Sequence, residues 1–281
     1  MESVAAWIEN SPYARMLGIA IDEITAERVR LVLPFAESNT NPGQVLHGGV
    51  AASLVAIAAQ AVARAALAAD AAPFHSASLQ VTYLAAAKAE AVVAEARLLR
   101  SGKELGFVDV QVRSEGGKAI AQGLVTVRGR SGQAEAALPE SRGDHGDAEP
   151  GPMGPQIAKT PFMGCLGLRV EHMMGGTSRI TFPFRAALAG ACGGVDEGAA
   201  LALLDTTGAM AAWAVTGPGP YRASTPALQA QFLAPPPAED LVAYGRAVHR
   251  DAEAHWCDVE VSGTRTRRVF LRGTVQYRIV T

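Results

Sequence analysis

Two long segments of the chain are apolar on nearly every side of a helix, and each is followed by segments in which apolar and polar residues alternate. The first, residues 50–69, is rich in alanine and carries only Gln60 and Arg64 as long polar side chains. A helix that is apolar nearly all round is typical of a protein core. Residues 199–215 have a similar composition, so the pattern predicts two buried central helices.

Strand patterns accompany each predicted helix. Residues 17–24 and 29–35, before the first helix, predict a β-hairpin. Four runs with a period of two follow that helix, at residues 77–85, 91–100, 106–113 and 119–128. After the second helix, similar runs lie near Leu228, Leu241, Trp256 and Phe270. A buried helix against a curled antiparallel sheet, present twice, places the chain in the α+β class.

The two halves of the chain are copies of one unit. A shift of 149 positions (161 − 12) places Pro12 on Pro161 and Leu54 on Leu203, with no gap from residue 12 to about residue 112. Such regularity predicts two equivalent domains, residues 1–129 and 157–281. Residues 130–156 are rich in Gly, Pro, Ser and charge and keep no apolar period, which predicts a linker between the domains.

Composition narrows the class of protein. A net charge of −2 over 281 residues argues against a nucleic-acid partner, which normally selects a basic surface. The three cysteines all lie in the second copy, so they predict neither a repeated metal site nor a disulfide framework. Residues 1–10 are not typical of a signal peptide, and the alanine-rich helix is too weakly apolar for a membrane span. We therefore expect a soluble, cytoplasmic protein.

The segment before the first helix carries a motif. Residues 41–50 read NPGQVLHGGV, residues 76–84 read SASLQVTYL and residues 117–123 read GKAIAQG. In this order they resemble the PaaI-like (phenylacetyl-CoA type) family of hotdog-fold acyl-CoA thioesterases, over nearly all of the first copy. The resemblance reaches the second copy only through the repeat.

That resemblance implies a fold and a type of chemistry. We expect two tandem hotdog domains, each a long central helix wrapped by a curved antiparallel sheet, which form a pseudo-dimer. Their sheets should pair edge to edge and their helices should lie side by side. The implied reaction is hydrolysis of an acyl-CoA with no metal or organic cofactor, and a homodimer of such double-hotdog chains is compatible with it.

The glycines of the motif suit an oxyanion. Gly48 and Gly49 place backbone N–H groups at the positive end of a helix with no Cβ in the way. The resemblance implies that Gly48 polarises the thioester carbonyl with help from His47 and Asn41, and that Gly49 contacts substrate. His47 can equally serve to fix the turn. The plainer alternative is that the glycines relieve crowding where the loop meets the helix.

The repeat shows what each copy lacks. The family's carboxylate, nine residues after the histidine, is Ala56 in the first copy and Asp205 in the second. A carboxylate in an apolar helix needs a reason, which is either catalysis or a hydrogen bond to Thr206 or Thr207. The family's water-orienting hydroxyl corresponds to Thr225 in the second copy. Ser76, its counterpart in the first copy, is expected to line an inactive site.

The second copy lacks the oxyanion motif. Asp196, Glu197 and Gly198 stand opposite His47, Gly48 and Gly49, and Gly190 stands opposite Asn41. Two carboxylates at a helix start are good capping residues but would repel an oxyanion. The losses are complementary, which predicts one composite site that takes its oxyanion hole from the first domain and Asp205 from the second.

The predicted function is hydrolysis of an acyl-CoA thioester to a free acid and coenzyme A. Asp205 would act either as a general base or as a nucleophile, with Thr225 holding the water. The alternative is a non-catalytic acyl-CoA-binding or sensing protein, which a large separation between Asp205 and Gly48 would favour. A hotdog hydratase is less favoured because its histidine-plus-acid pattern is absent from the chain.

Overall fold

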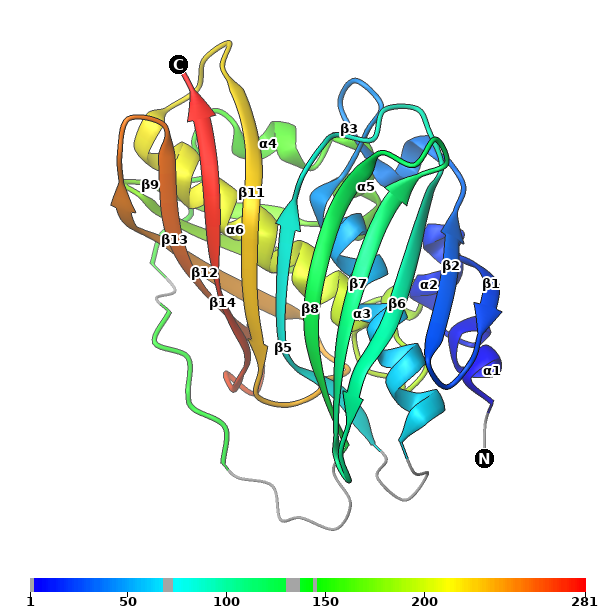
Figure 1. The fold of residues 1–281 in the computed structure, drawn as a ribbon. Helices are drawn as coiled ribbons and strands as arrows, with labels where there is room; N and C mark the ends of the chain where they lie inside the picture. The colour runs from blue at the N-terminus through cyan, green and yellow to red at the C-terminus, as the bar shows by residue number, and fades with distance from the viewer. Residues whose placement is uncertain (1–2, 68–72, 130–136, 144–145) are drawn as a thin grey trace.

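The two halves of the protein join into one continuous sheet that wraps around two helices (Figure 1). The computed structural model describes residues 3–67, 73–129, 137–143 and 146–281. The twelve strands follow the order β1-β2-β6-β7-β8-β5-β11-β14-β13-β12-β10-β9, in which the second half mirrors the first. The architecture confirms the predicted α+β class and pseudo-dimer.

In each half, two short helices, a β-hairpin, a short 3₁₀ helix (η), a long helix and four strands follow one another in the same order. The elements of the first half are α1 (Val4–Glu9), α2 (Pro12–Leu17), β1 (Ala20–Ile24), β2 (Arg28–Leu33), η1 (Glu37–Asn39), β3 (Thr40–Asn41), β4 (Val45–Leu46), α3 (Gly48–Ala66), β5 (Phe74–Tyr83), β6 (Val92–Ser101), β7 (Leu105–Ser114) and β8 (Ala119–Gly129). The elements of the second half are α4 (Gly154–Ile157), α5 (Pro161–Leu166), β9 (Arg169–Met174), β10 (Thr177–Phe182), η3 (Ala186–Leu188), α6 (Glu197–Thr216), β11 (Arg222–Phe232), β12 (Leu241–Arg250), β13 (Ala254–Gly263) and β14 (Val269–Val280).

The predicted first hairpin is correct except at its start. Residues 17–19 were expected in a strand, but Leu17 ends helix α2 and β1 begins at Ala20. The Ser11 side chain caps α2 by accepting from the Ala14 N–H, and Pro12 occupies its first turn. Gly18 then closes the helix with φ +82°, a left-handed conformation that favours glycine. These capping signals outweigh the apolar run that suggested a strand.

Both central helices lie under the sheet as predicted. By length and apolarity either could cross a membrane, yet 83% and 89% of their most apolar windows are buried inside the protein. The first was expected over residues 50–69, but it begins two residues earlier, at Gly48, because His47 caps it. Residues 68 and 69 lie outside the described part of the chain. Cys257 of β13 is buried in the core.

The two halves meet along one strand pair and one helix pair. Strands β5 and β11 pair antiparallel, with Gln80 opposite Gln229 in the middle of the register. Helices α3 and α6 run side by side behind them (Figure 1). A Cβ at Gly49 would lie 2.6 Å from Ala202 Cβ, and a Cβ at Gly198 would lie 2.6 Å from Ser53 Cβ. Glycines on both helices therefore allow their backbones to approach closely.

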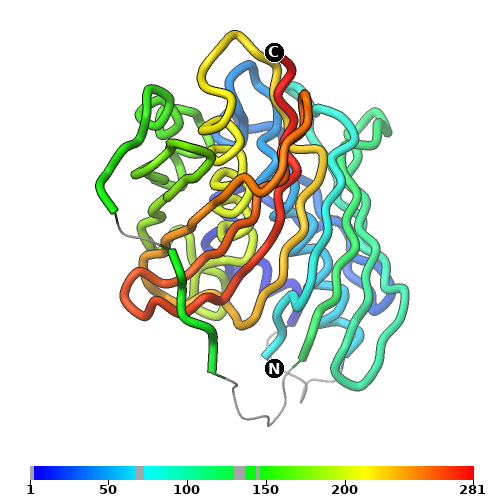
Figure 2. The backbone as a smooth tube through the Cα atoms, turned by 90° about the vertical axis from the view of Figure 1, so that its left-hand side faces the viewer, coloured from blue at the N-terminus to red at the C-terminus, as the bar shows by residue number. Residues whose placement is uncertain are grey.

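The described part of the predicted linker runs along the second domain (Figure 2). The Val269 N–H donates to the Pro139 carbonyl, and the Ser141 hydroxyl donates to Glu260 at 2.5 Å. Further along, the backbone of Glu149 forms an isolated parallel β-bridge with that of His172 in β9. These residues belong to the packed structure of the second half.

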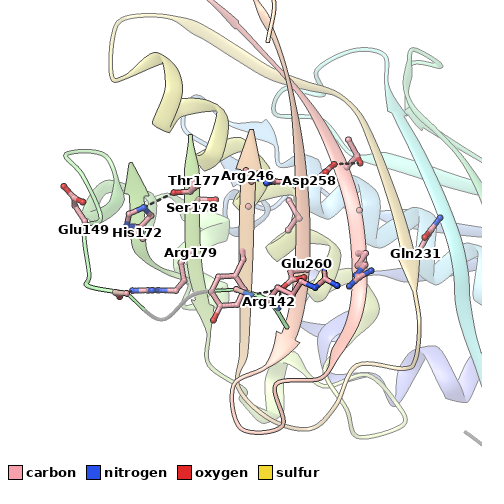
Figure 3. A pocket seen from close by; sticks show the side chains of 18 of the residues that line it. Arg142, Glu149, His172, Thr177, Ser178, Arg179, Gln231, Arg246, Asp258 and Glu260 are labelled. Atoms are coloured by element: carbon pink, nitrogen blue, oxygen red, sulfur yellow. Dashed lines mark hydrogen bonds between the residues drawn. The ribbon is translucent and has the colours of Figure 1, made fainter. Parts of the chain in front are cut away.

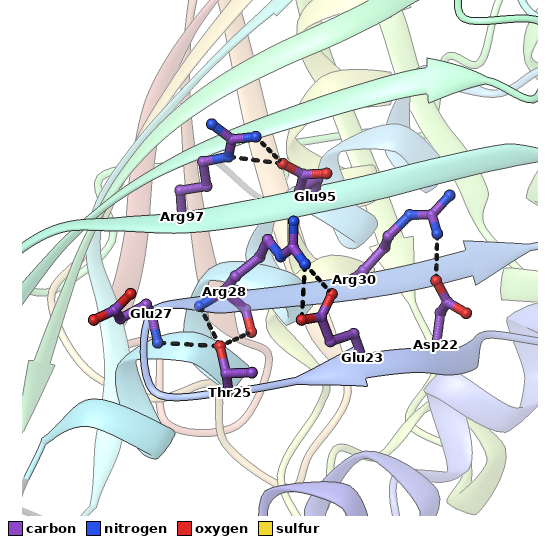
Figure 4. Close-up of polar contacts among 8 residues, drawn as sticks. All are labelled: Asp22, Glu23, Thr25, Glu27, Arg28, Arg30, Glu95 and Arg97. Carbon is purple, nitrogen blue, oxygen red and sulfur yellow. Dashed lines mark hydrogen bonds and ion pairs between the residues drawn. The ribbon is translucent and has the colours of Figure 1, made fainter.

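The outer strands of the first half carry ion pairs. Arg28 pairs with Glu23, Arg30 with Asp22 and Arg97 with Glu95 on β1, β2 and β6 (Figure 4). Exposed pairs of this kind contribute only about 0–1 kcal/mol each to stability. Charged side chains at a sheet edge do, however, discourage pairing with the edge of another sheet.

The helix contact generates a stability prediction. Gly198→Ala places a methyl group against the Ser53 backbone and Cβ, so we expect the free energy of unfolding to fall by about 1–3 kcal/mol through overpacking. Urea denaturation measures this change. Gly102→Ala is the matched control, because the nearest atom to its added Cβ is 3.8 Å away and its unfolding free energy should change by less than about 0.5 kcal/mol. Equal free energies of unfolding for Gly198→Ala and Gly102→Ala would contradict the close contact between Gly198 and Ser53.

Candidate active site

Residues of both halves meet where helix α3 begins. A Cβ at Gly48 of the first half would lie 3.0 Å from Oδ2 of Asp205, which belongs to α6 of the second half. The Thr225 hydroxyl of β11 donates to Asp205 Oδ1 at 2.8 Å. The structure therefore brings together three of the residues that the sequence singled out, one from the first copy and two from the second.

Asp205 is a buried carboxylate with an altered acidity. Its exposure is 4%, and burial raises its pKa from 3.8 to about 6, against the lowering effect of the Thr225 hydrogen bond. The hydroxyls of Thr206 and Thr207 donate instead to the helix carbonyls four residues earlier, those of Ala202 and Leu203. Thr225, and not a neighbour on the helix, is therefore the partner of the acid.

His47 caps helix α3. Its Nδ1 accepts the Gly49 N–H at 2.9 Å, and its ring packs on Phe162 of the second half with the ring centroids 5.0 Å apart. Burial lowers its pKa to about 4, so the imidazole is neutral at pH 7 and carries its proton on Nε2. Of the two roles considered for His47, the structure shows it fixing the turn.

The N–H of Gly48 is the donor that remains at the helix start. The Gly49 N–H is taken by His47, and the N–H groups of Val50 and Ala51 donate to the His47 carbonyl. Among the described residues, no acceptor contacts the Gly48 N–H. A free N–H at the positive end of a 19-residue helix, beside a carboxylate, is suited to an oxygen that develops negative charge.

In the described part of the chain, Asn41 has no hydrogen bond to the groups around Gly48. Asn41 is half-buried in β3, opposite Val45, and no hydrogen bond within the described residues joins its side chain to Gly48 or Asp205. Asn39 is the asparagine that supports the turn, because its amide donates to the Leu17 carbonyl and its own carbonyl accepts the His47 N–H. The role of Asn41 in polarising the thioester carbonyl and that of Gly49 in substrate binding stay predictions.

Sequence reasoning missed Tyr83. Its hydroxyl donates to the Gly48 carbonyl at 3.1 Å, and its ring carbon Cε1 lies 3.5 Å from the Cβ position of Gly48. Burial, and then the Asp205 charge, raise its pKa well above 10. One signal in the repeat could have identified it, because the residue 149 positions later is Phe232.

A second aromatic group lies further along α6. Trp213 Nε1 donates to the Tyr277 hydroxyl at 3.2 Å, and the Trp213 ring is nearly parallel to that of Tyr221. Burial, and to a smaller extent the Asp205 charge, raise the pKa of Tyr277 to about 12 against the effect of the Trp213 hydrogen bond.

The pseudo-symmetric position is filled by a carboxylate. Glu197, at the start of α6, accepts the Ser76 backbone N–H with both carboxylate oxygens, at 3.1 and 3.2 Å. The neighbouring Asp196 caps the helix by accepting the Gly198 N–H at 2.8 Å. Mainly through burial, the pKa rises to about 7 for Glu197 and to about 6 for Asp196. In the second copy, the Glu197 side chain thus fills the space that corresponds to the space between Gly48 and Asp205 in the first.

A large open cavity lies elsewhere, between the linker segment and the sheet of the second half (Figure 3). Its volume is about 990 Å³, and its lining includes none of the residues around Gly48 and Asp205. Four arginines and four carboxylates share the lining: Arg142, Arg179, Arg246, Arg272, Asp147, Glu149, Asp258 and Glu260. Because these charges balance, the cavity has no marked preference for an anion.

Comparisons with known proteins bear on the family and the fold. Residues 36–128 match the family model described as "Acyl-CoA thioesterase N-terminal domain". A candidate esterase of Halobacterium salinarum is 28% identical over 131 residues, which are 45% of this chain and 86% of that protein. Two solved structures are similar over nearly the whole chain, each with a TM-score of 0.69. One is a candidate thioesterase from Novosphingobium aromaticivorans (14% identical, 93% of this chain and 99% of that one). The other is the TesB protein of Mycobacterium avium subs paratuberculosis (13% identical, 99% and 100%).

These matches bear on the fold and on the enzyme class. The match to the thioesterase family model covers residues 36–128, and the solved structures show the hotdog fold, though not the chemistry, over the whole length of the chain. Thioester hydrolase is the enzyme class that these findings support.

The buried carboxylates of α6 predict how stability depends on pH. Glu197 and Asp196 have raised pKa values, so the folded protein binds more protons than the unfolded chain between about pH 4 and pH 7. Stability should therefore fall as the pH rises through this range. Glu197→Gln should flatten that slope, as measured by urea denaturation from pH 5 to pH 8. Glu115→Gln, at an exposed carboxylate, is the control, and an unchanged slope in Glu197→Gln would contradict the prediction.

Proposed function

We propose that the protein hydrolyses an acyl-CoA thioester at one composite site. The observation that carries this proposal is the proximity of Asp205, from the second half, to the start of helix α3, from the first. Hydrolysis needs a group that stabilises the oxyanion and a group that activates water. Each half of the chain supplies one of them. The PaaI-like subtype and a cytoplasmic location belong to the same proposal.

In the proposed mechanism the Gly48 N–H stabilises the oxyanion, Asp205 activates water and Thr225 holds Asp205 in place. The thioester carbonyl oxygen approaches the Gly48 N–H, where the helix dipole also favours negative charge. With a pKa of about 6, Asp205 is mostly ionised at pH 7 and takes a proton from the attacking water, whose oxygen bonds to the carbonyl carbon. The tetrahedral intermediate collapses, the C–S bond breaks, and the thiolate of coenzyme A leaves and is protonated. Thr225 keeps the carboxylate in place through its hydrogen bond.

Direct attack by Asp205 is the other balanced route. The carboxylate would then displace the thiolate to form a mixed anhydride, which water cleaves. Hydrolysis in ¹⁸O-labelled water under single-turnover conditions identifies this route when water attacks the Asp205 carbonyl carbon of the anhydride. Label enters the Asp205 carboxylate only if Asp205 is the nucleophile.

The mirror site lacks both functions. Ala56 replaces the acid, and the Glu197 carboxylate would repel an oxyanion at the start of α6. This arrangement supports one active site in each chain. A non-catalytic acyl-CoA-binding role would be favoured by an Asp205 remote from Gly48, and the observed proximity does not favour it.

Substitution of the acid tests the proposed function. With a panel of acyl-CoAs, Asp205→Asn should lower kcat by about 10²–10⁴-fold while substrate binding is retained, because the amide cannot accept the proton. Free-thiol release measures turnover. Ser76→Ala, in the mirror site, is the matched control and should keep wild-type activity. Absence of thiol release by the wild-type protein from every acyl-CoA would refute the enzyme and leave a ligand-binding protein.

The acidity of Asp205 generates a pH prediction. The base must be ionised, so kcat/KM should rise with pH, reach half its maximum near pH 6 and then level off. Thr225 lowers the pKa of Asp205 by donating a hydrogen bond to the charged form, so Thr225→Val should move this midpoint to higher pH. A shift of up to about one pH unit matches the worth of one such bond. A profile that stays in place in Thr225→Val would contradict the assignment.

A further inference from the structure

The peptide group between Gly48 and Gly49 is held from both sides. Its N–H, which belongs to Gly49, donates to His47 Nδ1 at 2.9 Å, and its carbonyl, which belongs to Gly48, accepts from the Tyr83 hydroxyl at 3.1 Å. The N–H and carbonyl of a trans peptide point in opposite directions. The two side chains therefore prevent rotation of the same plane from opposite ends.

This restraint acts where the backbone is least restrained by its own side chains. Glycine has access to a much wider range of φ and ψ than any other residue, and two glycines follow each other here. The Gly48 N–H belongs to the preceding peptide group, whose carbonyl, that of His47, accepts the Val50 and Ala51 N–H groups. Because the peptide group after Gly48 is held as well, φ and ψ of Gly48 are restricted, and with them the direction of its N–H. An oxyanion donor is effective because it is oriented before the reaction begins.

The second copy provides a natural comparison. Asp196 holds the Gly198 N–H at 2.8 Å, just as His47 holds that of Gly49. The position of Tyr83, however, is occupied by Phe232, which has no hydroxyl to donate. The restraint from both sides therefore occurs in the copy whose first helical residue is glycine and not in the copy where that residue is Glu197.

Tyr83 is placed to act on the peptide group and is a steady donor. It is the last residue of β5, where it pairs with Ala121 of β8, and the preceding Thr82 pairs with Ala227 of β11, so its backbone is anchored to the sheet. The side chain is half-buried and packs on Gly48. Because its pKa lies well above 10, the hydroxyl keeps its proton through the neutral range.

We propose that Tyr83 is a positioning residue that orients the Gly48 N–H toward the thioester carbonyl by holding the Gly48–Gly49 peptide group together with His47. The inference rests on the proposed thioesterase function and extends it to a residue that does not itself contact the reacting atoms. It explains why the Tyr83 hydroxyl donates to the carbonyl of Gly48, the residue beside Asp205.

Tyr83→Phe tests this role, because it removes only the hydroxyl and installs the residue of the second copy. We expect kcat to fall about 10-fold, less than the ~10²–10³-fold that loss of an oxyanion donor itself costs. KM, affinity for a non-hydrolysable thioether analogue, and the melting temperature should stay close to wild type. The pH profile should keep its shape at a lower plateau. Tyr244→Phe, on the outer face of the second half, is the control for loss of a hydroxyl.

Other results would overturn the proposal. An unchanged kcat, or a rise in KM alone, would show that the orientation of Gly48 does not depend on Tyr83. A fall in wild-type activity at alkaline pH that is absent from Tyr83→Phe would make the hydroxyl a proton donor to the leaving thiolate. Wild-type turnover that Asp205→Asn abolishes keeps the thioesterase function in place under each of these results, so the two proposals fail separately.

Discussion

The close contact between helices α3 and α6 is the constraint on which the rest of the structure depends. Gly49 lies against Ala202, and Gly198 lies against Ser53, so each helix begins beside the second turn of the other. The pairing of β5 with β11 continues the same relation through the sheet. Because of this geometry, a residue in the second turn or later of one helix meets the N-terminus of its partner. Asp205 thereby reaches Gly48 although 157 residues (205 − 48) separate them in the chain.

Fusion of two copies in one chain allows the two sites to differ. In a symmetric dimer every site needs both a glycine turn and a carboxylate, whereas here each half supplies one of them. The burial of three carboxylates near the helix starts is costly unless each has a hydrogen-bond partner. Asp205 has Thr225, Glu197 has the Ser76 N–H and Asp196 has the Gly198 N–H. The same fold therefore places Asp205 beside the start of α3, where Gly48 has no side chain, and places the Glu197 side chain in the corresponding space at the start of α6.

Much of this could be predicted from the sequence. The repeat, the two central helices and the strands after them follow from apolar periodicity, and the place of Asp205 follows from alignment of the two copies. The predicted start of the first hairpin was wrong, because the Ser11–Pro12 cap and Gly18 favour a short helix over a strand. Tyr83 and Asn39 were not identified, because their partners are backbone carbonyl and N–H groups, which carry no signal in residue identity. Only the difference between Tyr83 and Phe232 in the repeat marked the tyrosine.

The sequence by itself determined the duplicated α+β architecture and the division of an acid and a glycine turn between the copies, since both are properties of residue type at repeating positions. Only the tertiary structure decided that Asp205 lies beside Gly48 and bonds to Thr225, that His47 acts as a helix cap, and that Glu197 occupies the mirror site. These are distances and directions between segments far apart in the chain. They depend on how closely two helices pack, which periodicity and composition do not specify.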